Sequence, residues 1–220
     1  MKVIASWSGG KDSCLALYKA IQSGHEVKAL LNFVSEEYKR CCFHGIPPEL
    51  IQAQASSLGI PLVQHEMPVD MAGYEKEFVN IVSRLRDEQG IEAVVFGDIY
   101  LDEHKLWVEK VCRKAGVDAL EPIWNVPVDT VINEFISLGF KTKVVSAKAD
   151  ILGEDFVGSD IDKAAVAELK KNNVCVCGEG GEFHTFVYDG PLFNKSIEVT
   201  NYKKLLVDGF WKHWFLDIQV

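Results

Sequence analysis

The stretch Ser8-Gly9-Gly10-Lys11-Asp12-Ser13 lies between an apolar segment, residues 2–7, and a helical pattern, residues 13–24. The apolar segment predicts a buried strand, and apolar residues at helical spacing predict an amphipathic helix after the stretch. Adjacent glycines let the backbone turn tightly and bring its N–H groups against an anion. The start of a helix adds unpaired N–H groups and the positive end of the helix dipole. We therefore predict a phosphate-binding loop, in which Ser8 and Ser13 supply hydroxyl groups and Lys11 supplies a charge.

Two better-known phosphate loops are absent at this position. The pattern G-x-x-x-x-G-K-[ST] fails because position 5 is Ala and position 12 is Asp, and G-x-G-x-x-G fails because the glycines are adjacent. The structural alternative is an ordinary Gly-Gly turn that leads into a capped helix.

Strand-like and helical patterns alternate over the first 125 residues. Further strands are expected at 27–34, 62–66 and 93–96, and further helices at 48–58, 74–89 and 104–115. This alternation predicts an α/β fold, with an open parallel sheet that has helices on both faces. Such sheets bind ligands beyond the carboxyl ends of their strands.

Pro122 and Pro127 suggest a boundary between an ATP-binding domain, residues 1–125, and a smaller substrate-binding α/β lobe, residues 126–220. In the second lobe we expect a helix at 130–138, a strand at 141–146 and a helix at 161–172. The pattern becomes strand-like from Val174, with turns at Asp189-Gly190-Pro191 and Asp208-Gly209.

Composition narrows the class of protein. The chain has 220 residues, of which 48% are apolar, and a net charge of −9. Both halves are acidic, so a nucleic acid partner is not expected. The N-terminus does not read as a signal peptide, and no apolar run approaches the roughly 20 residues that span a bilayer. The six cysteines are expected to be reduced in a cytoplasmic protein, and their close pairs lack the C-x₂₋₄-C spacing of zinc sites.

Ser8–Ser13 resembles the PP-loop of the N-type ATP pyrophosphatases. Four further segments, in matching order over nearly the whole chain, resemble one branch of that superfamily, the diphthine–ammonia ligases. These segments are Cys42-Phe43-His44-Gly45, Val95-Phe96-Gly97-Asp98-Ile99, Leu120-Glu121-Pro122-Ile123-Trp124 and Gly178-Glu179-Gly180-Gly181-Glu182-Phe183-His184-Thr185. The last segment is the most specific of the four.

The resemblance implies a chemistry. The loop would hold the leaving pyrophosphate of ATP, and the products would be AMP and pyrophosphate. The substrate would be diphthine, a modified histidine of translation elongation factor 2, whose carboxylate is amidated with ammonium. The oligomeric state is left open, with a homodimer as one option.

Candidate residues in the first lobe lie at the predicted loop and after two strands. We expect Ser8–Ser13, His44, Gly97 and Asp98 to bind the nucleotide, with Asp12 and Asp98 as ligands of Mg²⁺. Gly97 either allows a sharp turn or lets adenosine approach closely. Asp98 either binds the metal or caps the next helix. His44 either binds nucleotide or substrate or is an ordinary surface or core residue.

Candidate residues in the second lobe cluster in the Gly178–Thr185 segment. Its glycines and carboxylates favour neither helix nor strand, which indicates a segment needed for its backbone shape or its polar groups. The alternative is a plain mobile loop. The expected catalytic residues are Lys11 and Asp12 for adenylation, and Glu179, Glu182 and His184 for binding ammonium and taking its proton. The expected substrate residues are Asp155, Gly180, Gly181, Phe183 and Thr185, with the Phe183 ring facing the quaternary ammonium of diphthine.

Three other functions fit parts of the pattern. A PP-loop enzyme that activates a tRNA base would need a basic surface, which the acidic halves argue against. A non-catalytic nucleotide sensor would bind ATP but would have no use for residues 179–185. A small-molecule amidotransferase would need a source of ammonia, and no glutaminase segment is evident.

Overall fold

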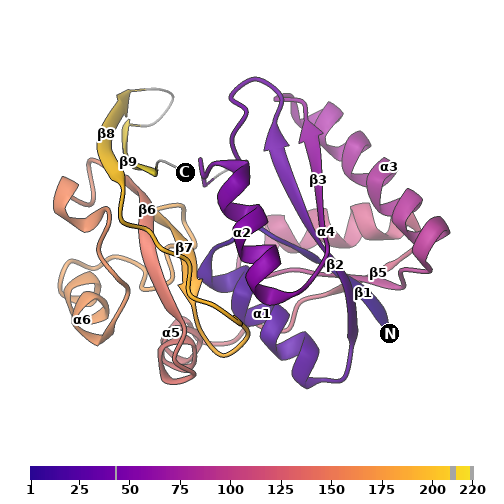
Figure 1. Ribbon diagram of the computed structural model, residues 1–220, viewed down its shortest axis with the longest axis horizontal. Coiled ribbons are helices and arrows are strands. Elements are labelled where there is room, and N and C mark those ends of the chain that lie inside the picture. The colour runs from indigo at the N-terminus through magenta and orange to yellow at the C-terminus, as the bar shows by residue number, and fades with distance from the viewer. Residues whose placement is uncertain (43, 209–211, 219–220) are drawn as a thin grey trace.

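The computed structural model describes residues 1–42, 44–208 and 212–218, and it places two sheets side by side (Figure 1). Phe43 of the Cys42–Gly45 segment and Gly209 of the second predicted turn lie outside the described residues. The first sheet is parallel, with the strand order β3-β2-β1-β4-β5. Its strands are β1 (Lys2–Ser6), β2 (Glu26–Ser35), β3 (Leu62–Met67), β4 (Ala93–Val95) and β5 (Asp118–Leu120).

Four helices cover the two faces of this sheet. They are α1 (Lys11–Gln22), α2 (Pro48–Leu58), α3 (Met71–Gln89) and α4 (Asp102–Ala115). Side chains alternate along β1, so that Val3 and Ala5 lie in the core that α1 and α2 cover, while Ile4 lies in the core under α3 and α4. The predicted fold class, a parallel sheet between helices, is confirmed.

The second lobe is built on an antiparallel sheet, β7-β6-β9-β8. Its elements are α5 (Val128–Ser137), β6 (Lys141–Lys148), the short 3₁₀ helix η1 (Glu154–Phe156), α6 (Lys163–Lys171), β7 (Phe183–Asp189), β8 (Tyr202–Asp208) and β9 (Lys212–Ile218). Phe186 of β7 and Leu15 of α1 belong to the same hydrophobic core. The two lobes therefore share one core, and Figure 1 shows β7 beside α1.

The structure corrects two expectations drawn from the sequence. Strand β5 was not predicted, because its three residues include the exposed Asp118 and do not form an apolar run as those of β4 do. The strand expected from Val174 begins only at Phe183. Gly178 and Gly181 take positive φ angles of 65° and 74°, so the chain turns before it enters β7.

The strand order indicates where the parallel sheet would bind a ligand. The chain runs from β1 to β2 and β3 on one side, and β4 and β5 lie on the other side of β1. The order therefore reverses between β1 and β4, and ligands of open α/β sheets bind at such a point, beyond the carboxyl ends of the strands. Residues 7–10 follow β1 there, and Gly97 and Asp98 follow β4.

Among the described residues, no helix combines the length and apolar character that a membrane span requires.

Candidate active site

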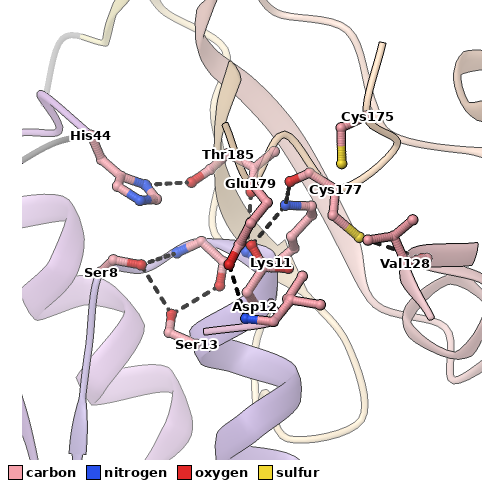
Figure 2. A network of polar contacts seen from close by, with 12 residues as sticks. Ser8, Lys11, Asp12, Ser13, His44, Val128, Cys175, Cys177, Glu179 and Thr185 are labelled. Carbon is pink, nitrogen blue, oxygen red and sulfur yellow. Dashed lines mark hydrogen bonds and ion pairs between the residues drawn. The ribbon is translucent and has the colours of Figure 1, made fainter. Parts of the chain in front are cut away.

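The segment after β1 forms a tight loop that ends in α1 (Figure 2). Gly9 has φ +81°, which favours glycine, and Gly10 is the N-cap of α1. The Gly10 amide donates to Ser8 Oγ at 3.3 Å, which lies 3.2 Å from Ser13 Oγ. Amides in the first turn of a helix have no carbonyl four residues earlier to pair with. The loop thus gathers amide and hydroxyl groups on one side, as an anion site requires.

Lys11 is buried rather than open to solvent, with 4% of its side chain exposed. Its ammonium group donates to Asp12 Oδ2 at 2.7 Å and to the carbonyl of Cys177, and it lies 5.3 Å from the centre of the Phe183 ring. Burial is the largest single influence on the pKa of Lys11 and lowers it, but Asp12, Cys177 and Glu179 together outweigh burial, and the pKa ends above its ordinary value. Lys11 is therefore charged and held between the two lobes.

Strand β7 of the second lobe lies along the loop. The Thr185 hydroxyl accepts the Lys11 amide at 3.0 Å, and the Val187 amide donates to the Gly9 carbonyl at 2.9 Å. Thr185 therefore caps α1 from the other lobe, which explains why this helix begins two residues earlier than its sequence pattern predicted. The loop Ser8–Ser13 and the Gly178–Thr185 segment meet at this point.

Two histidine rings lie next to each other beside the loop, one from each lobe, with their planes tilted by 40°. The rings of His44 and His184 are 4.6 Å apart, and His44 Nδ1 lies 3.1 Å from the Thr185 carbonyl oxygen. A Cβ atom at Gly10 would lie 2.6 Å from His44 Cε1, so only glycine leaves room for this ring. Burial lowers the pKa of His44 to about 4, and burial and the nearby His44 lower the pKa of His184 as well. Both imidazoles are neutral near pH 7.

Neutral His44 makes the free energy of unfolding dependent on pH. The pKa is depressed in the folded chain, so the unfolded chain takes up the proton first as the pH falls from 6.5 towards about 4. Stability is therefore full above this window and is lost through it, by about 2 kcal/mol from about pH 7.5 to about pH 5 for this residue. Urea unfolding at both pH values should show a smaller loss for His44→Gln than for the wild type. Equal losses would contradict the assignment.

A third group of residues joins the end of β4 to the Gly178–Thr185 segment. Glu179 Oε1 accepts the Ile99 amide at 2.9 Å, and Asp98 Oδ1 lies 2.9 Å from His104 Nδ1. Ligand atoms of Asp98, His104 and Glu179 all lie within 4.8 Å of one another. The carboxylate oxygen atoms of Asp98 and Glu179 and the ring nitrogen of His104 suit a divalent cation. Asp12 Oδ1, which is buried without a hydrogen-bond partner among the described residues, is a further candidate ligand.

The sequence left two roles open for each of the residues after β4. Asp98 was expected to bind the metal or to cap the next helix, and Gly97 to allow a sharp turn or a close approach of adenosine. Asp98 does not cap the next helix, because the N-cap of α4 is Leu101. A Cβ atom at Gly97 would lie 2.7 Å from the backbone nitrogen of Ser13. Gly97 therefore lets the end of β4 press against the first turn of α1, a close approach that the sequence alone did not indicate.

Glu182 lies in the turn before β7. Its Oε2 atom is buried and has no hydrogen-bond partner in the part of the chain that the structure describes. The turn is fixed to β6, since Lys148 donates from its amide to the Glu182 carbonyl and from Nζ to the Gly180 carbonyl, both at 2.9 Å. Gly181 has a positive φ, and a Cβ atom at Gly180 would lie 3.1 Å from Glu182 Oε1. The two glycines therefore shape the backbone around this carboxylate.

Two predicted substrate residues, Phe183 and Asp155, are not placed to contact a substrate beside the loop. The Phe183 ring is 1% exposed and packs against Phe156 in the core. Its burial argues against the expected contact with a substrate cation, and Lys11 already occupies its vicinity. Asp155 is exposed on η1, and no hydrogen bond or ion pair joins it to the other candidate residues within the described ranges.

Three contributors to the site were missed from the sequence: Gln54, His104 and the carbonyl of Cys177. Gln54 carried a usable signal, because it is a polar residue on the apolar stripe of α2 that contains Leu50, Ile51 and Leu58. His104 is exposed on the first turn of α4, and a backbone carbonyl leaves no trace in the residue type. The roles of His104 and of the Cys177 carbonyl could therefore not be recognised without the fold.

Family comparisons agree with the two-lobe geometry. Residues 1–119 match the diphthamide synthase N-terminal domain, and residues 127–218 match the diphthamide synthase C-terminal domain. The chain belongs to the diphthamide synthase family. The predicted family is thus confirmed, and so is the predicted class of enzyme, a carbon–nitrogen ligase.

Curated relatives cover most of the chain. It is 29% identical to the diphthine–ammonia ligase of Homo sapiens, over 90% of this chain and 83% of the human protein. It is 27% identical to that of Danio rerio, over 90% of this chain and 86% of the relative. A solved structure from Methanocaldococcus jannaschii, described as a predicted subunit of tRNA methyltransferase, aligns over 90% of this chain and 100% of the other, with 18% identity and a TM-score of 0.48.

Proposed function

We propose that this chain is a cytoplasmic ATP-dependent amide ligase. Its substrate is diphthine on translation elongation factor 2, and its products are diphthamide, AMP and pyrophosphate. One observation carries the proposal: the loop Ser8–Ser13 and the segment Gly178–Thr185 come from different lobes and meet through the Lys11 amide and the Thr185 hydroxyl, 3.0 Å apart. A site for phosphates and a site for a second substrate thereby adjoin.

Adenylation takes place at the loop. The substrate carboxylate forms a bond to the α-phosphorus of ATP, while the bond from that phosphorus to the bridging oxygen breaks. Pyrophosphate leaves towards donors that the loop already gathers before the charge develops, the Gly10 amide and the hydroxyls of Ser8 and Ser13, and Lys11 moves to join them. Lys11 leaves its partners at Asp12 and Cys177 to do so. Mg²⁺ would be held by Asp12 and Asp98 and would neutralise part of the phosphate charge.

Amidation takes place at the carboxylates of the second lobe. The nitrogen of ammonia attacks the acyl carbon, AMP leaves, and a proton passes from the nitrogen to a base. Glu182 suits this base, because its Oε2 atom is buried without a partner among the described residues, whereas Glu179 Oε1 is engaged by the Ile99 amide. His184 is neutral near pH 7 and adjoins the same segment, so it can also accept a proton.

The proposal is tested by ATP turnover with ammonium and purified elongation factor 2 that carries diphthine. We expect AMP rather than ADP, together with equal amounts of pyrophosphate and diphthamide, detected by chromatography and mass spectrometry. Controls omit ammonium or use elongation factor that lacks diphthine. Formation of ADP would contradict cleavage between the α and β phosphates, and ATP binding without turnover would favour a nucleotide sensor.

A further inference from the structure

Gln54 is a fully buried amide on the apolar face of α2. Its exposed fraction is 0%, and the buried residues Leu50, Ile51, Ala55 and Leu58 share its side of the helix. A buried amide is costly unless its donors and acceptor are paired. The partners of Gln54 therefore indicate why a polar side chain stands in this apolar stripe.

Gln54 connects three separate segments. Its Oε1 accepts the Trp7 indole N–H at 2.9 Å, and its Nε2 donates to the carbonyls of Gly9 at 2.9 Å and of Val187 at 2.6 Å. The indole nitrogen can only donate, and the two carbonyls can only accept. These partners leave one orientation of the amide, with Oε1 towards Trp7 and Nε2 towards the loop and β7.

The Gly9 carbonyl is held from two sides, by Gln54 Nε2 and by the Val187 amide at 2.9 Å. The peptide bond between Gly9 and Gly10 is trans, so its C=O and N–H point in opposite directions. The carbonyl faces α2 and β7, and the Gly10 N–H consequently faces the Ser8 hydroxyl, to which it donates at 3.3 Å. Glycine on both sides would let this peptide rotate at little cost if the carbonyl were released.

We propose that Gln54 is a positioning residue that orients the Gly9–Gly10 peptide, so that the Gly10 amide points at the pyrophosphate portion of bound ATP. The inference rests on the proposed function, because it takes this loop as the pyrophosphate site. Gln54 acts through the peptide and does not touch the nucleotide. It also ties the peptide to Val187, so the second lobe takes part in shaping a loop of the first.

The test compares binding of inorganic pyrophosphate and of adenosine, with Mg²⁺ present, by titration calorimetry. Gln54→Met keeps the volume of the side chain and removes all three hydrogen bonds. We expect the affinity for pyrophosphate to fall by about tenfold or more, since one oriented donor is lost. Adenosine carries no phosphate, so its affinity should change by less than about twofold. A general loosening of the fold would lower both affinities together.

Two further variants complete the design. Thr142→Val is the matched control, because Thr142 is equally buried but lies on β6 with its hydroxyl unpaired among the described residues. Its pyrophosphate affinity should equal that of the wild type. Trp7→Phe removes the indole donor that orients Gln54, together with some buried ring volume that both ligands would register equally, and it tests the same peptide if Gln54→Met does not fold. We expect a smaller selective fall, of about threefold, because the amide keeps its other partners.

Unchanged pyrophosphate affinity in Gln54→Met, or parallel loss of both ligands in both variants, would overturn the assignment of Gln54 and leave the proposed function standing. Failure of the wild-type chain to bind pyrophosphate would instead remove the proposed function, and the role of Gln54 with it.

Discussion

Replacement of Lys11 by Ala is expected to lower pyrophosphate release from ATP by at least about 100-fold, in the presence of ammonium and diphthine-bearing elongation factor 2. The lost ammonium group would turn from Asp12 and Cys177 towards the charge that develops on the leaving pyrophosphate, and one donor to such a charge contributes about 10²–10³ in rate. The measurement is the initial rate of pyrophosphate release under saturating ATP.

The structure indicates that this substitution also lowers the free energy of unfolding, an effect that the sequence did not reveal. Lys11 is paired with Asp12 and with the carbonyl of Cys177, so its removal leaves two acceptors without their donor. We expect the free energy of unfolding to fall by about 1–3 kcal/mol while the chain remains folded. Lys11→Met keeps the buried stem and isolates the charge. Lys19→Ala is the matched control, since Lys19 lies on the same helix but pairs with Glu134 at 2.6 Å. Normal pyrophosphate release from Lys11→Met would refute the phosphate role.

Replacement of Glu182 by Ala is expected to separate the two half-reactions. Adenylation should continue, because no hydrogen bond joins Glu182 to the loop Ser8–Ser13 among the described residues. Amide formation should fall by at least about 100-fold, the usual contribution of a positioned general base. The measurement is a single turnover in which pyrophosphate and diphthamide are quantified from the same sample.

Glu182→Gln is the matched variant, because it keeps the shape of the side chain and removes its basicity. It should behave as Glu182→Ala does if the carboxylate takes the proton of ammonia. Glu168→Ala, on the exposed face of α6, should leave both half-reactions unchanged. Normal amide formation by Glu182→Gln would assign the proton to another group, with His184 as the next candidate.

Both predictions depend on the contact between the lobes. The amide of Lys11, the Gly9 carbonyl and the Ile99 amide are each bonded to a residue of the second lobe. A shared hydrophobic core holds the lobes in this arrangement. The boundary predicted near residue 126 therefore separates two stretches of the chain that form one site together.

Much of the first lobe follows from local patterns in the sequence. The alternation of apolar runs and amphipathic helices predicted four of the five parallel strands and all four helices, because burial of one face imposes a period on each segment. The tight glycine turn that leads into α1 was predictable for the same kind of reason. Adjacent glycines and a following helix act on residues that are neighbours in the chain.

The environment of each candidate side chain was decided only by the tertiary structure. The bond between Thr185 and the Lys11 amide spans 174 positions, and that between Gln54 and Val187 spans 133. Burial of the Phe183 ring and the close approach of Gly97 to Ser13 likewise depend on how the lobes pack. Turn chemistry and hydrophobic period reach only a few residues along the chain. Packing of the hydrophobic core brings distant segments together and thereby determines which residues form hydrogen bonds across it. No local sequence pattern contains that information.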